Sequence, residues 1–225
     1  MFFLIFVQVA IWNRCCTVIN LIVNIIKFSI MGKINLDLNK TYTYADYLKW
    51  SFDETIELIR GLVVKMAPAP GLSHQIISRK LTIRMGLYFE NKNCQLFSAP
   101  FDVRLPLIKD KTKDVEITTV VQPDLCVVCD PHKLDPRGCI GAPDLIIEIV
   151  SPGNTKKELK QKFEVYQESG VKEYWLVLSA EKSVIIYTLN ELGVYIGSKP
   201  YIEEDTLSSP QFPGMEIDLS YVFAD

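Results

Sequence analysis

A glutamate stands in the middle of an apolar run. Residues 145–150 read Leu-Ile-Ile-Glu-Ile-Val, and Glu148 is the fourth of them. A continuous apolar run of this length predicts a strand that is buried on both faces. Because an unpaired buried carboxylate is costly, Glu148 should be ion-paired, hydrogen-bonded or bound to a metal ion. The simpler alternative is a structural glutamate that is paired with a lysine near the end of its strand.

A second carboxylate, Asp124, lies in a similar apolar segment after Val120-Val121-Gln122-Pro123. Neighbouring strands lie about 4.8 Å apart, so carboxylates that project from two such strands could share a hard cation. Mg²⁺ suits such a site, because it is usually bound by one or two carboxylates, waters and substrate phosphate oxygens. Asp144 is a competing candidate, but it lies on the same strand as Glu148 and about 13 Å away. We therefore favour Asp124 as the partner of Glu148.

A lysine in the following segment could supply positive charge. Hydrolysis of a phosphodiester needs a cation near the attacking water and the pentavalent phosphate. Leu159, Phe163 and Tyr166 have the spacing of a buried helical stripe, and Lys162 flanks that stripe. The alternative for Lys162 is a surface lysine whose ammonium reaches water. Three other lysines of this segment are expected to be solvated: Lys156, Lys157 and Lys160.

Cysteine and histidine residues give a weaker signal. Cys126 and Cys129, with His132 and Cys139 nearby, could suggest zinc, but residues three apart on a strand point to opposite faces. We therefore expect no zinc site. The six cysteines show no disulfide framework, so we expect reduced thiols in a cytoplasmic protein. His74, near a predicted helix start, is expected to cap or pack, and a role in the site stays open.

The body of the chain predicts a mixed α/β fold. The expected helices span residues 43–50, 73–91 and 154–170, of which the second is capped by Ser73 and the third ends at a glycine. The expected strands span residues 55–66, paired across Gly61, then 97–105, 115–128, 144–150, 173–178, 184–189 and 194–196. In the helix over 73–91, the expected buried residues are Ile76, Ile77, Leu81 and Leu87. Residues 221–223 form a final hydrophobic anchor.

The first 30 residues are apolar and unlike the remainder. Asn13 and Arg14 interrupt the run of about 20 apolar residues that a transmembrane helix needs, and no small-residue cleavage site marks a signal peptide. Met31 opens a polar stretch that resembles an ordinary start. We expect residues 1–30 to lie outside the fold and residues 31–225 to form one domain. Membrane association is expected only if residues 1–30 belong to the native protein.

Composition limits the function without deciding it. The chain is 48% hydrophobic and 23% charged, which is typical of a soluble globular domain. Its net charge of −3 provides no overall basic field of the kind that marks many nucleic-acid-binding proteins. A nuclease with its lysines gathered on one face remains compatible with this charge.

Several short segments occur in an order that is specific as a set, although each alone is common. They are Gln122-Pro123-Asp124-Leu125, residues 141–152, Lys162, Tyr166, Gly170-Val171 and Glu173-Tyr174-Trp175, with weaker matches upstream at residues 57–61 and His74. This ordered set resembles the Uma2 family of the PD-(D/E)XK nuclease superfamily, over roughly residues 41–190. The resemblance implies a restriction-endonuclease-like core, in which a central mixed sheet is flanked by helices.

The resemblance also implies roles for individual residues. Asp124 and Glu148 would bind Mg²⁺ or Mn²⁺, with the backbone carbonyl of Ile149 as a third ligand. Glu57 would be an accessory acid near the metal ion. The implied function is a metal-dependent endonuclease that hydrolyses phosphodiester bonds, with DNA as the expected substrate.

The chain departs from the superfamily and family patterns at three places. The superfamily lysine normally lies two residues after the glutamate, where this chain has Val150. In the family the lysine is moved to the following helix, which points to Lys162. Arg60-Gly61-Leu62 replaces a common Asp-Gly-Glu, and Asn154 stands where serine is common. Neither of these last two changes removes a proposed ligand.

Two other functions remain open from the sequence. One is a catalytically silent module that binds nucleic acid or protein, and the other is a hydrolase that acts on a different substrate. The joint presence of Asp124, Glu148 and Lys162 favours the nuclease, because a decayed site would be expected to lose one of them. The sequence leaves open whether the protein is a homodimer.

Overall fold

The computed structural model describes residues 36–37, 40–50, 56–65, 71–107, 112–151 and 154–224. Leu38–Lys49 and Glu54–Asp225 form one compact unit, to which the helices and strands of the fold belong. The prediction that residues 1–30 lie outside the fold concerns residues outside this description. In the described part of the chain, no helix combines the length and the apolar character needed to cross a membrane.

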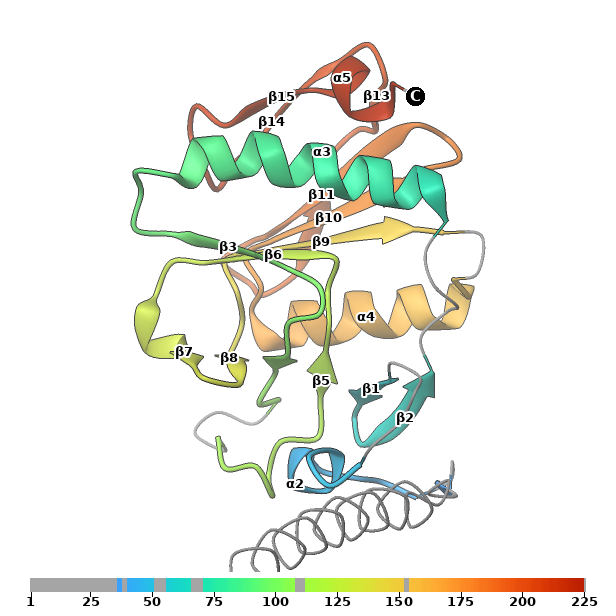
Figure 1. Ribbon diagram of the computed structural model, residues 1–225, viewed down its shortest axis with the longest axis vertical. Helices are drawn as coiled ribbons and strands as arrows, with labels where there is room; N and C mark the ends of the chain where they lie inside the picture. The colour runs from blue at the N-terminus through green and yellow to red at the C-terminus, as the bar shows by residue number, and fades with distance from the viewer. Residues whose placement is uncertain are drawn as a thin grey trace, which may run out of the picture. The chain divides into compact units, whose positions relative to one another are not determined.

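The fold is mixed α/β, as the sequence predicts (Figure 1). Its helical elements are α2 (Tyr44–Tyr47), α3 (Leu72–Phe89), η1 (Pro131–Lys133), α4 (Lys156–Ser169) and α5 (Leu219–Phe223). The central sheet has the order β12-β11-β10-β9-β6-β3, with β13 beside β11. Its strands are β3 (Gln95–Ser98), β6 (Leu125–Val128), β9 (Leu145–Val150), β10 (Glu173–Leu178), β11 (Ser183–Leu189), β12 (Tyr195–Gly197) and β13 (Tyr201–Ile202).

A second sheet has the order β2-β1-β5-β4-β8-β7, and β14 pairs with β15 in a separate hairpin. The strands of these two groups are β1 (Ile56–Ile59), β2 (Leu62–Lys65), β4 (Val103–Arg104), β5 (Val120–Val121), β7 (Leu134–Asp135), β8 (Gly138–Ile140), β14 (Thr206–Ser208) and β15 (Glu216–Asp218). The second sheet brings β1 into the neighbourhood of α4.

The central sheet is mixed around β9. This strand pairs in parallel with β10 and antiparallel with β6. In the antiparallel pairing Leu125 stands opposite Ile147, so the residue before Leu125 is level with the residue after Ile147. That register places Asp124 beside Glu148, as the spacing of neighbouring strands predicts.

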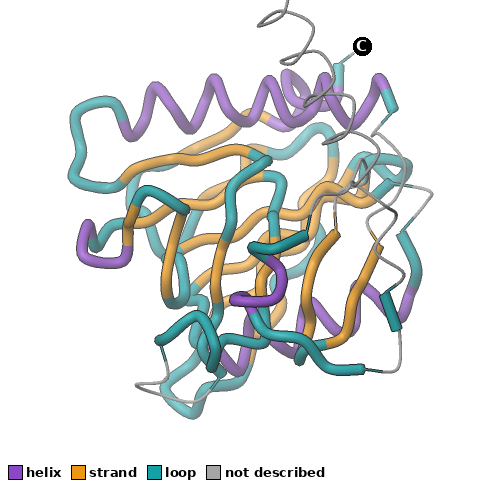
Figure 2. The backbone as a smooth tube through the Cα atoms, turned by 60° about the horizontal axis from the view of Figure 1, so that its bottom comes forward, coloured by secondary structure: helices purple, strands orange, loops and turns teal. Residues whose placement is uncertain are grey.

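Helices cover both faces of the central sheet. Helix α3 and the C-terminal elements lie on one face, and α4 lies on the other (Figures 1 and 2). Successive side chains of a strand point to opposite faces. Leu145, Ile147 and Ile149 accordingly join the core beneath α3, whereas Ile146 joins the core that contains residues of α4. Glu148 shares the face of Ile146, so its carboxylate points toward α4.

Helix α3 begins one residue before its predicted start and ends two residues before its predicted end. Its N-cap is Gly71, and Ser73 lies inside the first turn. Ile77 and Leu81 are buried as expected, but Leu87 is 63% exposed. At 3.6 residues per turn, Leu87 points well away from the face that Ile77 and Leu81 define, whereas Met85 continues that face. The assignment of Leu87 to the buried side was therefore wrong.

Helix α4 and the hairpins follow the sequence signals closely. Thr155 caps α4 by accepting a hydrogen bond from the backbone N–H of Glu158, and Gly170 ends it with a φ of 84°. The turn between β1 and β2 lies at Arg60 and Gly61, both with positive φ. The hairpin of β10 and β11 is also confirmed.

Other predicted elements are shorter or divided. The segment 115–128 contains β5 and β6, separated around Pro123, which has no N–H to donate to a strand neighbour. The segment 97–105 likewise contains the end of β3 and the short strand β4. Helix α2 covers only Tyr44–Tyr47 of the expected residues 43–50.

The expectation of reduced thiols is wrong for one pair of cysteines. Cys94 and Cys129 form a disulfide. They are brought together because Gln95 pairs with Val128 across β3 and β6. Cys126 lies in the core on the α4 side, whereas Cys129 packs against the core beneath α3. The predicted separation of these two cysteines across the sheet is therefore confirmed.

Candidate active site

Lys162 and Glu148 form the centre of the site. Lys162 lies on the inner face of α4, and its side chain is only 3% exposed. Its Nζ donates to Glu148 Oε1 at 3.0 Å. The alternative interpretation of Lys162 as a solvated surface lysine is therefore wrong. The other lysines near the start of α4, Lys156, Lys157 and Lys160, are exposed as predicted.

Glu57 contacts the same ammonium from strand β1. Its Oε1 lies 3.0 Å from Lys162 Nζ and accepts a hydrogen bond of 2.8 Å from the backbone N–H of Gln122. Its Oε2 is buried and, among the described residues, has no hydrogen-bond donor. Lys162 is thus held between two carboxylates that come from different sheets.

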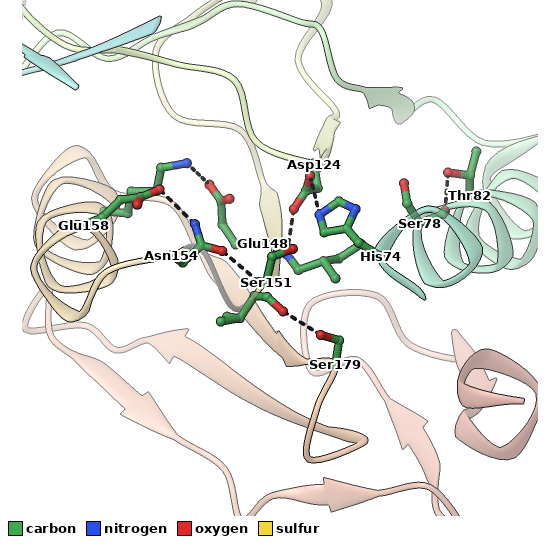
Figure 3. Close-up of polar contacts among 12 residues, drawn as sticks. His74, Ser78, Thr82, Asp124, Glu148, Ser151, Asn154, Glu158 and Ser179 are labelled. Atoms are coloured by element: carbon green, nitrogen blue, oxygen red, sulfur yellow. Dashed lines mark hydrogen bonds and ion pairs between the residues drawn. The ribbon is translucent and has the colours of Figure 1, made fainter. Parts of the chain in front are cut away.

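Asp124 lies next to this group, immediately before β6. Its Oδ2 accepts a hydrogen bond of 2.7 Å from the backbone N–H of Ile149, one residue after Glu148 (Figure 3). Its Oδ1 lies 3.1 Å from Nε2 of His74, on the first turn of α3. The structure therefore brings together every residue to which the sequence assigned a part in the site, and it adds His74.

Tyr166 was not predicted as a site residue from the sequence. Its hydroxyl donates to Glu148 Oε1 at 2.5 Å, while its ring packs edge-on against Tyr174. Its spacing from Leu159 and Phe163 indicated only a place in the apolar stripe of α4. Its position four residues after Lys162 was the available signal, because residues four apart share one face of a helix.

Burial and charge shift the pKa values within the site. Burial raises the pKa of Glu148 to about 7, and the negative charges of Asp124 and Glu57 act in the same direction. The Lys162 ammonium and the Tyr166 hydroxyl oppose this rise. Burial alone would lower the pKa of Lys162, but the Glu148 and Glu57 carboxylates raise it above its usual value. Lys162 therefore carries its positive charge at neutral pH.

Asp144 has a different environment and does not belong to this group. Its carboxylate is ion-paired with Lys172 at 2.8 Å and accepts a hydrogen bond from the backbone N–H of Cys129. Burial would raise the pKa of Asp144, but these two partners lower it below its usual value. The structure therefore places Asp124, and not Asp144, in the group around Glu148.

The site offers only a small number of side chains that could bind a cation. Among the described residues, no group of three or more histidine, cysteine, aspartate or glutamate side chains could hold a metal ion. The carboxylates of Glu148, on β9, and Asp124, just before β6, offer oxygen donors side by side, and Ile149 could add a backbone carbonyl. A small set of hard oxygen donors matches the way in which proteins bind Mg²⁺, with waters and substrate phosphates completing the coordination.

A mixed sheet between helices, with its acidic cluster where β6 and β9 meet, has the architecture of the restriction-endonuclease-like nucleases. The chain belongs to the Uma2 family, whose model, described as "Putative restriction endonuclease", matches residues 44–220. The resemblance inferred from residues 122–175 is therefore confirmed.

Two individual proteins extend this comparison. An uncharacterized protein of Synechocystis sp. is 23% identical over 154 residues, which are 67% of this chain and 76% of that protein. A crystal structure from Anabaena variabilis, described as "a putative nuclease belonging to DUF820", matches with a TM-score of 0.64. The match has 17% sequence identity and covers 81% of this chain and 97% of the other. It confirms the fold.

Proposed function

We propose that the protein is a metal-dependent endonuclease that hydrolyses phosphodiester bonds in DNA. The observation that carries the proposal is the buried Lys162 ammonium, held between Glu57 and Glu148, with the Asp124 carboxylate near enough to Glu148 to raise its pKa. A buried charged cluster is an uncertain contributor to stability, because removing charges from water can cost more than their attraction returns. Perturbed charged groups of this kind gather at functional sites. Membership of the Uma2 family supports the same reaction.

The charge of the cluster supports a divalent cation. With all three carboxyl groups of Glu57, Asp124 and Glu148 ionised, the cluster with the Lys162 ammonium would carry a net charge of −2. Burying such a charge without compensation is unfavourable. The raised pKa of Glu148 means that the cluster holds a proton more tightly than an isolated carboxyl does. A divalent cation would replace that proton and balance the remaining charge.

The proposed roles follow from the positions of the groups. Asp124 and Glu148 would hold Mg²⁺ or Mn²⁺, together with the backbone carbonyl of Ile149. When bound, the ion supplies a Lewis acid that lowers the pKa of water and stabilises charge on phosphate oxygens. Lys162, because its pKa is raised, serves as a fixed positive charge rather than as a proton acceptor. Its place beside Glu148 suits it to orient the attacking water or to stabilise charge on the phosphate.

Glu57 and Tyr166 position these groups. Glu57 Oε1 is ion-paired with the Lys162 ammonium, and the same oxygen accepts a hydrogen bond from the backbone N–H of Gln122. Tyr166 donates to the Glu148 oxygen that also faces Lys162. Lys162 and Tyr166, both on α4, therefore restrict rotation of the Glu148 carboxylate. In the described part of the chain Oε2 makes no hydrogen bond, so it would be the oxygen that faces the ion.

Cleavage assays test the proposal directly. Purified protein is incubated with supercoiled plasmid, single-stranded DNA and RNA, in Mg²⁺, in Mn²⁺ or in chelator. Conversion of plasmid to nicked or linear forms with either ion, and none in chelator, is the expected result. Cleavage of RNA but not of DNA would show that the substrate is RNA and not DNA. Binding of nucleic acid without cleavage in any condition would favour the silent binding module.

Metal binding should depend on pH below neutrality. Because the pKa of Glu148 is raised to about 7, this carboxyl is protonated in the metal-free protein at lower pH and must lose the proton to bind a cation. Metal affinity is therefore expected to rise about tenfold per pH unit as pH approaches 7 from below, and to level off above it. Calorimetric titration in buffers of different ionisation enthalpy measures both the affinity and the protons released.

Glu148→Gln provides the control for this pH dependence. This substitution removes the titrating carboxyl group and should weaken metal binding. The metal affinity that remains should no longer rise with pH between the usual glutamate range and pH 7. An unchanged pH profile in this variant would show that another group is responsible.

A further inference from the structure

We infer that His74 is a positioning residue that fixes the Asp124 carboxylate for metal binding. The inference rests on the proposed function, because it assigns a partner to one of the proposed ligands. His74 belongs to α3, on the opposite face of the central sheet from Lys162. The imidazole therefore contacts Asp124 from the α3 side of the sheet, whereas Lys162 contacts Glu148 from the α4 side.

Asp124 is held through both carboxylate oxygens and through its backbone carbonyl. Oδ2 accepts from the Ile149 N–H at 2.7 Å, and Oδ1 lies 3.1 Å from His74 Nε2 (Figure 3). The backbone carbonyl of Asp124 accepts a hydrogen bond from Ala99, which fixes the main chain. Rotation of the carboxylate would move one oxygen away from Ile149 and the other away from His74. The two contacts together set its plane, while each oxygen keeps a lone pair for a cation.

The environment of His74 indicates that the residue is needed for its contact with Asp124. The side chain is 10% exposed, and its Nδ1 is buried without a hydrogen-bond partner among the residues that the structure describes. A buried polar atom without a partner is unfavourable, so an apolar residue would fill the same space at lower cost. Among the described residues, the polar side-chain contact of the imidazole is with Asp124. Packing alone does not explain a histidine here.

The backbone of α3 makes the contact rigid. His74 lies in the first turn of an 18-residue helix, which is anchored in the core by Ile77, Leu81 and Met85. A metal-binding carboxylate that is fixed by such a neighbour needs little reordering when a cation binds. Loss of an outer partner of this kind typically weakens metal binding by about 10–100-fold.

Three substitutions of His74 separate positioning from packing. His74→Leu fills similar space without a polar group, His74→Gln keeps an N–H donor, and His74→Ala removes both. His132, the other histidine of the chain, is exposed on η1 and provides the matched control His132→Ala. Calorimetry with Mn²⁺ alone measures affinity for the full chain of each variant. Thermal midpoints in chelator measure the stability of the metal-free fold.

The expected result is a loss of metal affinity in each variant that lacks the polar contact between residue 74 and Asp124. His74→Leu and His74→Ala should bind Mn²⁺ about 10–100-fold more weakly, His74→Gln should regain part of the loss, and His132→Ala should match the native protein. The affinities should not follow the thermal midpoints, since His74→Leu keeps most of the packing.

Two results would overturn the inference. Native Mn²⁺ affinity in His74→Leu would show that His74 only packs. Nitrogen coupling to bound Mn²⁺ in electron paramagnetic resonance, lost in His74→Gln, would make His74 a ligand rather than a positioning residue. Absence of Mn²⁺ binding in the native protein is a separate outcome, because it contradicts the proposed function itself.

Discussion

Lys162→Met is expected to lower the turnover of bound DNA by about 10²–10³-fold, the usual loss when one preorganised charged or hydrogen-bonding group is removed. Methionine has similar length and no charge, so the space between Glu57 and Glu148 stays filled. Metal affinity should be retained, because the proposed ligands remain and a competing positive charge is gone. Single-turnover cleavage at saturating Mg²⁺ measures the effect.

The stability of this variant needs a parallel measurement. Removing one partner of a buried ion pair typically costs about 3–5 kcal/mol, and Glu57 and Glu148 both lose their ammonium. Assays are therefore run well below the thermal midpoint of each variant. Lys162→Arg should recover only part of the rate, since a planar guanidinium does not replace a compact ammonium.

Exposed lysines of the same helix give matched controls for Lys162→Met. Lys156→Ala and Lys160→Ala remove charge from the surface of α4 and are expected mainly to weaken DNA binding, in a salt-dependent way. Native turnover in Lys162→Met, with the fold intact, would remove Lys162 from the catalytic machinery.

Loss of either proposed ligand should have the largest effect of all. Asp124→Ala and Glu148→Ala are each expected to reduce metal-dependent cleavage by about 10³-fold or more. The double variant should be little worse than either single one, because groups that act as a unit give non-additive losses. Calorimetric titration should show that metal binding is lost along with activity. Undiminished metal binding in the double variant would contradict the assignment of both ligands.

Asp144 provides the control carboxylate for these variants. It lies just before β9 but is ion-paired with Lys172 and hydrogen-bonded to Cys129. Asp144→Asn should therefore reduce thermal stability while leaving metal affinity and cleavage near their native values. This contrast separates loss of the site from a general weakening of the sheet.

The parts of the site that depend on local pattern could be predicted from the sequence. Glu148 interrupts an apolar strand, and Lys162 flanks a helical stripe, so both signals lie within a few neighbouring residues. Strand spacing then indicated Asp124, which the β6–β9 register places level with Glu148. The place of Glu57 near the site was implied only by the resemblance, because β1 belongs to another sheet, and its pairing with Lys162 was not predicted.

The parts that depend on distant contacts could not be predicted. Nothing near His74 in the sequence indicates that the first turn of α3 lies beside Asp124, 50 positions later in the chain. The Cys94–Cys129 disulfide depends on the pairing of β3 with β6, which the cysteine count does not reveal. Leu87 was misassigned because an apolar residue in a helical segment resembles a core residue until the helical phase is fixed, and the apolar residues of α3 lie on more than one side of the helix.

The location of a bound ion tests the central claim most directly. Crystals grown with Mn²⁺ allow the ion to be found by its anomalous scattering, independently of any activity. The expected result is an anomalous peak between the carboxylates of Asp124 and Glu148, at about the 2 Å distance of hard cations from oxygen ligands. An ion bound elsewhere, or no ion at these two residues at saturating Mn²⁺, would contradict the proposal that they form the catalytic metal site.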